Sequence, residues 1–179
     1  MDVRDAVALI RDAVGNGTGI WADLGAGTGT FTRALARILD AESTIYAVDD
    51  DVNAVAALRG WAATSPTRII PVRANLTHSL ELPGLGAKPL DGILLANSLH
   101  FMPNAERVLM QLARRVRVGG RVIVVEYDRR VPSRWVPYPI QASHWLRLAA
   151  SAGLTDAAVT ATRPSAYAGV LYVGVATRA

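Results

Sequence analysis

A glycine-rich stretch near the start of the chain lies between an expected strand, residues 20–24, and an expected helix, residues 30–39. It reads Asp23-Leu24-Gly25-Ala26-Gly27-Thr28-Gly29-Thr30. Glycines allow a tight turn and let a ligand approach the backbone closely. The N-terminus of the helix behind the turn offers free N–H groups and a partial positive charge. The stretch therefore suits a polar or anionic group of a ligand.

A second acid, Asp49, ends the next expected strand, residues 44–48. A carboxylate in this position can accept hydrogen bonds from both hydroxyls of a ribose, so the two features together predict an adenosine-type cofactor. The dinucleotide fingerprint is G-x-G-x-x-G, but here the third glycine, Gly29, comes one residue early and Thr30 stands in its place. A P-loop is excluded because no Gly-Lys-Ser/Thr follows the glycines.

These residues need a scaffold that brings the ends of several strands together. After Asp2, which suits an N-cap, apolar residues recur at helical spacing. Further helices are expected at 52–63, 105–116 and 141–152. Further strands are expected at 69–73, 92–96 and 121–127, the last preceded by a turn at Gly119-Gly120. Alternating strands and helices predict an α/β fold with an open, doubly wound, mostly parallel sheet and helices on both faces.

The end of the chain breaks this alternation. Two strand-like runs, residues 157–162 and 170–177, follow each other without a helix between them. The short gap at Arg163-Pro164-Ser165 suits a hairpin. We therefore expect the sheet to finish with an antiparallel pair.

Here the sequence resembles the class I S-adenosylmethionine-dependent methyltransferases. Their first motif is acid-x-Gly-x-Gly-x-Gly, which Asp23, Gly25, Gly27 and Gly29 match, and their second is an acid ending strand two, here Asp49. The resemblance implies a Rossmann-like seven-stranded sheet whose C-terminal strand is antiparallel. It covers most of the chain and implies a single domain over residues 1–179, with a short N-terminal helical segment at 1–18.

Three more motifs of the family occur in the expected order. After strand three the family usually has an acid, and this chain has Asn75, followed by Leu76. Residues 90–101 look like the strand-four segment of small-molecule methyltransferases related to the quinone-biosynthesis enzymes. Residues 116–127 are close to the family's Leu-Lys-Pro-Gly-Gly turn and strand five, with Val118 in place of the proline.

The resemblance implies a role for each of these residues. The three glycines would contact the methionine half of S-adenosylmethionine, and Asp23 would bind its amino group, directly or through water. Asp49 would hold the ribose, and Asn75 and Leu76 would flank the adenine, although Asn75 also suits a turn. Asp50 and Asn97 complete the set of cofactor-binding candidates. Asp50 and Asp51 better suit the N-cap and first turn of the next helix, where negative charge is favoured.

Residues after strands four and five are expected at the ligand-binding edge of the sheet. His100 is the candidate general base, although in this family the position more often only shapes the site. Tyr127, Asp128 and His144 are further candidates, whereas His78 suits a surface loop. The segment 135–140 and Trp145 either wall an apolar pocket for the methyl acceptor or cover the core.

Composition narrows the range of functions. The chain has no cysteine, which excludes disulfides, zinc-thiolate sites and cysteine nucleophiles, and its three histidines have no metal-site spacing. It carries no recognisable signal peptide or membrane-spanning stretch, so we expect a cytoplasmic protein without a membrane partner. The net charge is +4, but the arginines are spread along the chain, and the tight groups are Arg114-Arg115-Val116-Arg117 and Arg129-Arg130.

Several functions remain open. The favoured one is methyl transfer to a small molecule, recognised by the N-terminal helix, by the segment around Trp135 or by a partner subunit such as a second copy in a homodimer. Nucleic acid is a less suitable acceptor, because Asn97-Ser98-Leu99-His100 replaces the Asn/Asp-Pro-Pro-Tyr/Phe motif of base methylation and Lys88 is poorly placed for RNA 2′-hydroxyl chemistry. The sequence also leaves open a protein methyltransferase, a nicotinamide-dependent oxidoreductase and a non-catalytic cofactor-binding partner.

Overall fold

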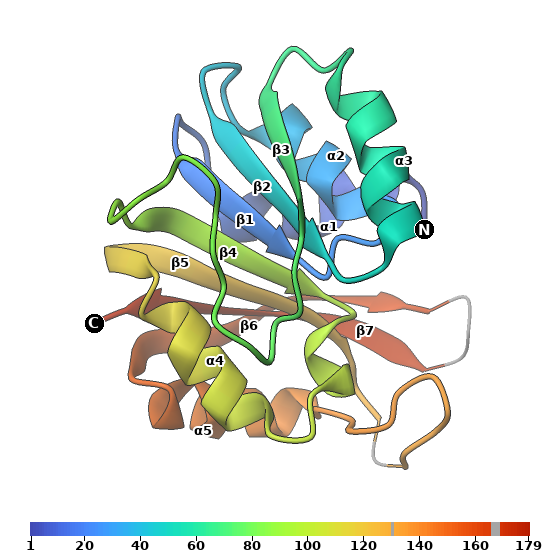
Figure 1. The fold of residues 1–179 in the computed structure, drawn as a ribbon. Helices are drawn as coiled ribbons and strands as arrows, with labels where there is room; N and C mark the ends of the chain where they lie inside the picture. Colours follow the sequence, from blue (N-terminus) through green and yellow to red (C-terminus); the bar gives the residue numbers. More distant parts are fainter. Residues whose placement is uncertain (130, 166–168) are drawn as a thin grey trace.

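The computed structural model describes residues 1–129, 131–165 and 169–179 (Figure 1). Arg130, one of the grouped arginines, lies outside these residues. The helices are α1 (Val3–Val14), α2 (Thr30–Ile38), α3 (Val52–Ala62), α4 (Ala105–Ala113) and α5 (Ala142–Ser151), with a 3-10 turn η1 (Leu99–Phe101). The strands are β1 (Ile20–Leu24), β2 (Thr44–Asp49), β3 (Arg68–Arg73), β4 (Leu90–Ala96), β5 (Val116–Tyr127), β6 (Leu154–Pro164) and β7 (Val170–Arg178).

The strands of the described residues form one seven-stranded sheet in the order β3-β2-β1-β4-β5-β7-β6. Strands β1 to β5 pair in parallel, and β7 pairs antiparallel with both β5 and β6. The expected doubly wound, mostly parallel sheet with a C-terminal antiparallel strand is therefore confirmed. Strand β7 lies inside the sheet, between β5 and β6, so β6 forms the edge.

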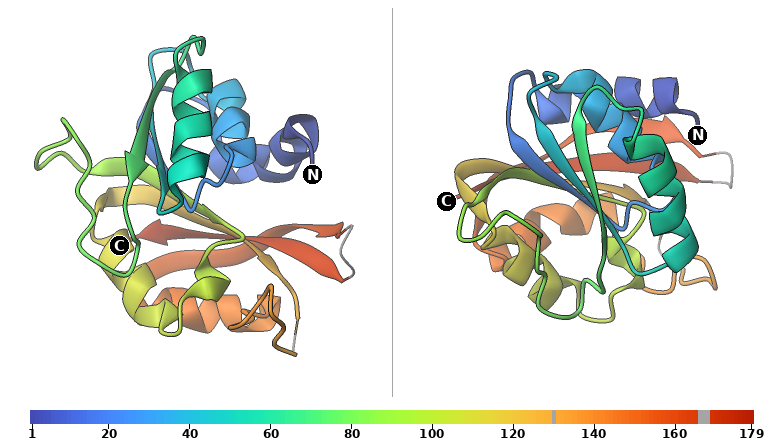
Figure 2. Two further views of the ribbon diagram at one scale, coloured as in Figure 1. Left: turned by 45° about the vertical axis from the view of Figure 1, so that its right-hand side comes forward. Right: turned by 45° about the horizontal axis from the view of Figure 1, so that its top comes forward.

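Helices cover both faces of this sheet, as expected (Figure 2). One hydrophobic cluster contains side chains of α1, α2 and α3, including Ile10, Leu35 and Leu58. The other contains side chains of α4 and α5, including Leu109 and Trp145, and also leucines of the segment 74–89. This segment joins β3 to β4 without a helix of its own, and its leucines cover the sheet where a crossover helix would otherwise lie.

Local sequence explains where several elements begin. Asp2 caps α1 by accepting a hydrogen bond from the N–H of Asp5, and Asp51 caps α3 through the N–H of Asn53. Trp145 fixes α5 to the sheet. Its ring lies over Gly174, where an added Cβ would come within 2.8 Å, and its Nε1 donates to the carbonyl of Val175. Trp145 is thus a core residue and not a wall of an acceptor pocket.

Several expected boundaries were wrong. The strand expected at 157–162 extends from Leu154 to Pro164, so Arg163 and Pro164, expected in the hairpin gap, pair with β7 instead. The helix expected at 105–116 ends at Ala113, and Gly119-Gly120 is not a turn but part of the long strand β5. The pairing of β4 with β5 shifts register here, from Leu90 opposite Val116 to Gly92 opposite Arg121. A Cβ on Gly120 would lie 2.7 Å from the carbonyl oxygen of Asp91, so glycine is needed for this irregularity.

The order of the strands reverses between β1 and β4. From β1 the chain moves outward to β2 and β3, and it then returns to place β4 on the other side of β1. In open α/β sheets, ligands bind at the carboxyl ends of the strands where this reversal occurs. The glycine turn follows β1, and Asn97 follows β4, so both lie at this point. Among the described helices, none is both long and apolar enough to cross a membrane.

Candidate active site

The glycine turn after β1 is held by hydrogen bonds within the protein. The N–H groups of Gly25 and Ala26 both donate to the carbonyl of Val48 at the end of β2, at 2.8 and 2.9 Å. The N–H of Gly27 donates to Oδ2 of Asp49 at 2.7 Å. These donors are already used, so the turn offers fewer free N–H groups to an anion than its sequence suggests. The main contribution of the turn to ligand binding is therefore the shape of its backbone.

The three glycines of the motif have three different neighbours. A Cβ on Gly25 would lie 2.4 Å from the Cβ of Ser98, and one on Gly29 would lie 2.5 Å from Cδ2 of Leu58. A Cβ on Gly27 would meet no atom within 4 Å. Gly27 therefore faces open space, whereas Gly25 and Gly29 are glycines because other parts of the protein pack closely against them.

A cavity of about 570 Å³ opens at the carboxyl ends of β1, β2 and β4. Seven of the nine residues expected to bind the cofactor line it, namely Gly25, Gly27, Asp49, Asp50, Asn75, Leu76 and Asn97. Ala74, Thr77, Ser98, Phe101 and Met102 complete the lining. Of these, only Ser98 was expected at the ligand-binding edge of the sheet, where it follows strand four. Asp23 and Gly29 are not part of this lining.

The charged lining of this first cavity is acidic. Asp49 and Asp50 contribute carboxylates, and no Lys or Arg of the described residues lines it. A pyrophosphate would face two negative charges here without a basic partner. A ribose and a cationic group are compatible with the same charges, because a carboxylate accepts hydroxyl protons and attracts positive charge.

Asp23 lies behind the glycine turn and is almost completely buried, with 1% of its surface exposed. Its Oδ2 accepts a hydrogen bond of 2.6 Å from the hydroxyl of Thr32, which connects β1 to α2. Its Oδ1 is buried, and no described residue bonds to it. The pKa of Asp23 is raised from 3.8 to about 7, mainly by burial and in smaller part by the nearby charge of Asp49, while hydrogen bonding from Thr32 opposes the shift.

Asn75 and Leu76 form the side of the cavity that follows β3. Leu76 is buried, but Asn75 is exposed, and its Oδ1 accepts hydrogen bonds from the N–H and the hydroxyl of Thr77. Both lone pairs of this oxygen are used in the turn. Asn75 therefore adopts the turn geometry that its residue type also suggested, and its NH₂ group is what is left to contact a ligand.

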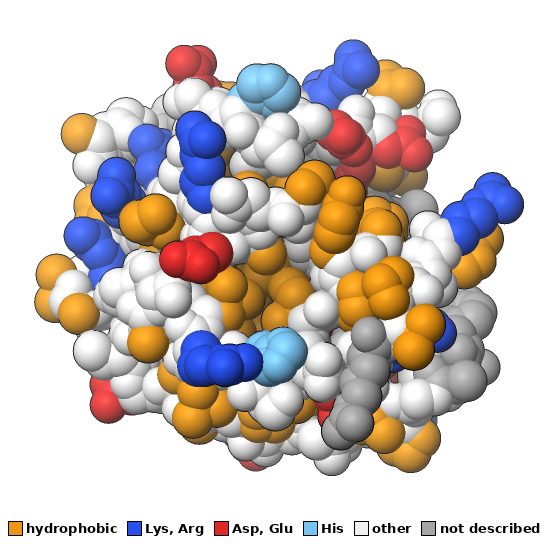
Figure 3. All heavy atoms as spheres, turned by 90° about the horizontal axis from the view of Figure 1, so that it is seen from below, with side chains coloured by type: hydrophobic (Ala, Val, Ile, Leu, Met, Phe, Trp, Pro, Cys, Tyr) orange, Lys and Arg blue, Asp and Glu red, His pale blue; other side chains and the backbone are white. Residues whose placement is uncertain are grey.

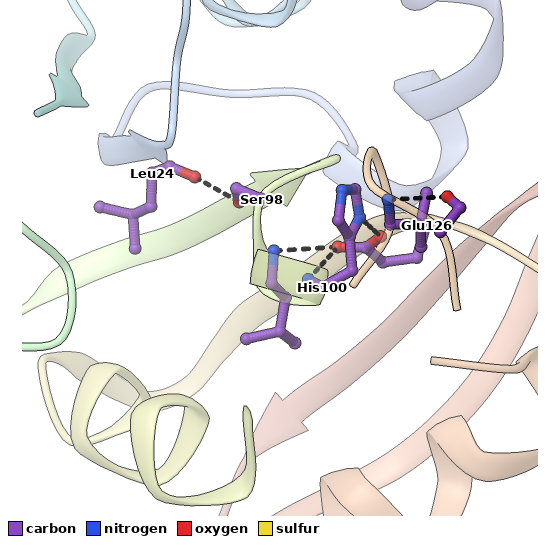
Figure 4. A network of polar contacts seen from close by, with 7 residues as sticks. Leu24, Ser98, His100 and Glu126 are labelled. Atoms are coloured by element: carbon purple, nitrogen blue, oxygen red, sulfur yellow. Dashed lines mark hydrogen bonds and ion pairs between the residues drawn. The ribbon is translucent and has the colours of Figure 1, made fainter. Parts of the chain in front are cut away.

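Ser98 and Asn97 complete the cavity at the end of β4. Ser98 Oγ donates to the carbonyl of Leu24 at 2.7 Å, which ties β4 to the end of β1 (Figure 4). Asn97 has a φ of +54°, uncommon for a residue other than glycine, and its N–H donates to Val125. Its Oδ1 is buried without a bonding partner among the described residues. A strained residue with an unused polar atom at this position points to a functional role.

A second cavity, of about 510 Å³, adjoins the first and shares Asn97 and Phe101 with it. Its other lining residues are His100, Tyr127, Arg129, Trp135 and Val136. The side chain of Trp135 is 71% exposed, so it stands at the rim. Trp135 and Val136 thus wall a pocket, while Ile140 and Trp145 of the same aromatic segment belong to the core.

His100 is held by a buried acid that the sequence interpretation had not singled out. Its Nδ1 lies 2.5 Å from Oε2 of Glu126, and the two residues are 2% and 0% exposed. The other oxygen of Glu126 accepts from the N–H groups of Leu99 and His100 (Figure 4). A sequence signal existed, because an acid near the end of a strongly apolar strand is costly to bury unless it has partners.

The remaining candidates do not line these two cavities. His78 and His144 are exposed, and Oδ1 of Asp128 accepts from the N–H of Ala142. A third cavity, of about 470 Å³, places Met1 and Asp5 beside Asn97 and Tyr127, so the N-terminal helix borders the same region. Within the described residues, no group of His, Asp or Glu side chains could hold a metal ion.

Comparison with known proteins identifies a family. The sequence profile of the methyltransferase domain family matches residues 22–124, which include part of β1, all of β2 to β4 and most of β5. A comparison with curated protein sequences finds no match.

Solved structures share the fold. The YcgJ protein from Bacillus subtilis is 12% identical with a TM-score of 0.76, and the alignment covers 98% of this chain and 99% of that one. A SAM-dependent methyltransferase from Aquifex aeolicus is 14% identical with a TM-score of 0.76, covering 98% and 90%. The [4+2]-cyclase SpnF is 17% identical with a TM-score of 0.76, covering 98% and 81%. The fold alone therefore does not determine the reaction.

Proposed function

The chain belongs to the methyltransferase domain family, and from this premise we propose that it transfers a methyl group from S-adenosylmethionine to a small-molecule acceptor. The family implies the cofactor and the type of reaction. We propose further that residues 1–179 act as a single domain, and that the acceptor enters the second cavity.

The observation that carries this proposal is the acidic lining of the first cavity. S-adenosylmethionine has a ribose, a positively charged sulfonium and a positively charged amino group, and it has no phosphate. Asp49 and Asp50 suit such a ligand. The pyrophosphate of a nicotinamide dinucleotide would lack donors, because the N–H groups of Gly25, Ala26 and Gly27 are already bonded within the protein. The open space beside Gly27 and the buried, unbonded Oδ1 of Asp23 fit S-adenosylmethionine, because one leaves room for it and the other needs a donor.

We assign the binding roles as follows. Asp49 holds the ribose hydroxyls through the lone pairs that its bonds to Gly27 and Asp51 leave unused. Leu76 and the NH₂ group of Asn75 contact the adenine. Gly27 and Asn97 border the methionine half, and Asp23 receives its amino group, directly or through water. Gly25 and Gly29 act indirectly, by letting Ser98 and Leu58 pack against the turn.

The cofactor supplies an electrophilic methyl group, so the protein's task is mainly alignment and exclusion of water. Asn97 and Phe101 line both cavities and therefore stand where the two ligands meet. The second cavity has aromatic and aliphatic walls in Phe101, Tyr127, Trp135 and Val136, which suit an apolar acceptor. The resemblance of residues 90–101 to the quinone-biosynthesis group points to the same kind of acceptor.

The distribution of charge makes RNA a less suitable acceptor than a small molecule. The face that carries α4 and α5 has hydrophobic side chains gathered in a central hollow, with Lys and Arg at separate places around it (Figure 3). Nucleic-acid surfaces need a more continuous basic patch. A second copy of the chain remains our candidate for a partner subunit that completes the acceptor site.

A backbone amide NMR titration tests where the cofactor binds. Addition of S-adenosylhomocysteine, the demethylated product, should shift the signals of Gly27, Asp49, Asn75 and Asn97. The signal of His144, which is exposed and lines neither cavity, should stay in place and serve as the control. Shifts confined to residues around Trp135 would contradict the assignment of the first cavity.

A further inference from the structure

The contact between Glu126 and His100 determines which nitrogen of the imidazole carries a proton. A carboxylate only accepts hydrogen bonds when ionised, so the 2.5 Å contact places a proton on Nδ1. A neutral imidazole then has a free lone pair on Nε2. In the part of the chain that the structure describes, no hydrogen bond uses Nε2, and His100 lines the second cavity.

The carboxylate itself is firmly positioned. Besides Nδ1, Glu126 accepts the N–H groups of Leu99 and His100 at 2.9 and 3.2 Å, and its side chain is completely buried. Three donors from η1 therefore converge on one acid of β5. This arrangement fixes the ring of His100 relative to the sheet and leaves it little freedom to rotate.

We propose that Nε2 of His100 removes the proton from a hydroxyl group of an aromatic acceptor during methyl transfer, and that Glu126 is the positioning residue for this base. The inference deepens the proposed function and rests on it. The aromatic ring of the acceptor would lie among Phe101, Tyr127 and Trp135, which line the cavity together with His100.

The proposed step balances without a further reactant. A bond forms between the acceptor oxygen and the methyl carbon, and the carbon–sulfur bond breaks with its electron pair left on sulfur. The hydroxyl proton moves to Nε2, so the positive charge lost from sulfur appears on the imidazole beside Glu126. The proton later leaves to solvent, which returns His100 to its neutral form.

A phenolic hydroxyl gains from such a base because its neutral form is a weak nucleophile. Its pKa is about 10, as for tyrosine, so only a small fraction is ionised at neutral pH. A positioned base typically accelerates this kind of step by about 10²- to 10⁴-fold. An acidic phenol is already ionised in solution and gains little from the base.

The first test determines which ring nitrogen of His100 carries the proton, and it needs no methyl acceptor. Long-range ¹H–¹⁵N NMR of the wild-type protein should show the Nδ1–H form, with the signal assigned by its absence in His100→Gln. In Glu126→Gln the amide can donate to Nδ1, so the ring should change to the Nε2–H form. An Nε2–H ring in the wild type would overturn the proposal, even if Glu126→Gln does not fold.

The second test uses a series of substituted phenols of increasing acidity, with release of S-adenosylhomocysteine as the readout. His100→Gln should lose about 100-fold or more in rate with weakly acidic phenols and much less with 4-nitrophenol. The exposed His144 provides the matched control, and His144→Gln should behave as the wild type. An equal loss with every phenol would mean that His100 only shapes the cavity.

The two proposals can fail separately. If calorimetry shows that the wild type does not bind S-adenosylmethionine, the proposed function is wrong. If the wild type binds it but methylates none of the phenols, or if His100→Gln methylates them all at the wild-type rate, the inference about His100 is wrong and the proposed function still stands.

Discussion

Gly25 and Ser98 are in such close contact that any side chain at position 25 would overlap with Ser98. A Cβ on Gly25 would lie 2.4 Å from the Cβ of Ser98, and Gly25 also has a φ of +82°. Ser98 uses this proximity to donate a hydrogen bond to Leu24. The contact joins the carboxyl ends of β1 and β4, which are the two strands on either side of the reversal in strand order.

Alanine substitutions should separate the glycines that pack from the glycine that borders the ligand. Gly25→Ala combines a left-handed backbone with an overlap, which together cost roughly 2 to 5 kcal/mol of unfolding free energy. Gly27→Ala should cost only about 1 kcal/mol but should weaken S-adenosylmethionine binding, because its methyl group enters the cavity. Urea unfolding and calorimetry measure the two effects. Equal losses of stability would contradict this distinction.

Asp49 should be essential for cofactor binding. We expect Asp49→Ala to abolish binding of S-adenosylmethionine, since no other described carboxylate accepts from the glycine turn at this position. Asp51→Ala is the matched acid control. It removes the N-cap of α3, which costs about 1 kcal/mol of stability, but should leave the affinity unchanged. His100→Ala should also bind the cofactor nearly as well as the wild type. Unchanged affinity in Asp49→Ala would show that the ribose lies elsewhere.

Asp23 should make the protein less stable as pH rises. Its pKa is about 7 in the folded protein and 3.8 ordinarily, so between these values the folded state holds the proton more tightly. The unfolding free energy should therefore fall between about pH 4 and pH 7, by at most about 1.4 kcal/mol per pH unit. Above about pH 7 it should level off. Asp23→Asn keeps an acceptor for Thr32 and should lack this decline. Parallel curves for the two proteins would contradict the buried, protonated carboxyl.

The same carboxyl predicts a proton release when the cofactor binds. A positively charged amino group near Asp23 would favour its ionised form, so binding at pH 6.5 should expel part of a proton. Calorimetry in buffers of different ionisation enthalpy measures this number, and Asp23→Asn should reduce it to near zero. An apparent enthalpy independent of the buffer would assign Asp23 a structural role only, through its bond to Thr32.

Most of the fold could be predicted from the sequence because the signals that begin its helices and form its strands lie within short stretches of the chain. Asp2 and Asp51 mark helix starts, and β-branched runs mark the strands. The order of glycines and acids identified the ends of β1 and β2. The extension of β5 through Gly119-Gly120 was missed, because a bulge depends on the neighbouring strand and not on local residue preference. The helix expected to continue to residue 116 ends early because Val116 pairs with Leu90 in that strand.

The site was predictable in outline but not in its pairings. Sequence order placed Asp49, Asn75 and Asn97 at strand ends, where all three line one cavity. It could not show that Ser98 needs the space at Gly25, or that Glu126 reaches the ring of His100. These contacts join residues that are far apart along the chain, so they depend on the strand order. Trp135 and Trp145 belong to neighbouring segments, yet only the fold places one at a cavity rim and the other in the core.

The most direct test of the account is calorimetric titration of the protein with S-adenosylmethionine, S-adenosylhomocysteine and NAD under the same conditions. The acidic lining beside Asp49, together with a glycine turn whose N–H groups are already bonded within the protein, predicts micromolar binding of the first two and none of NAD. Binding of NAD, or no binding of S-adenosylmethionine, would contradict the central claim that this cavity holds the methyl donor.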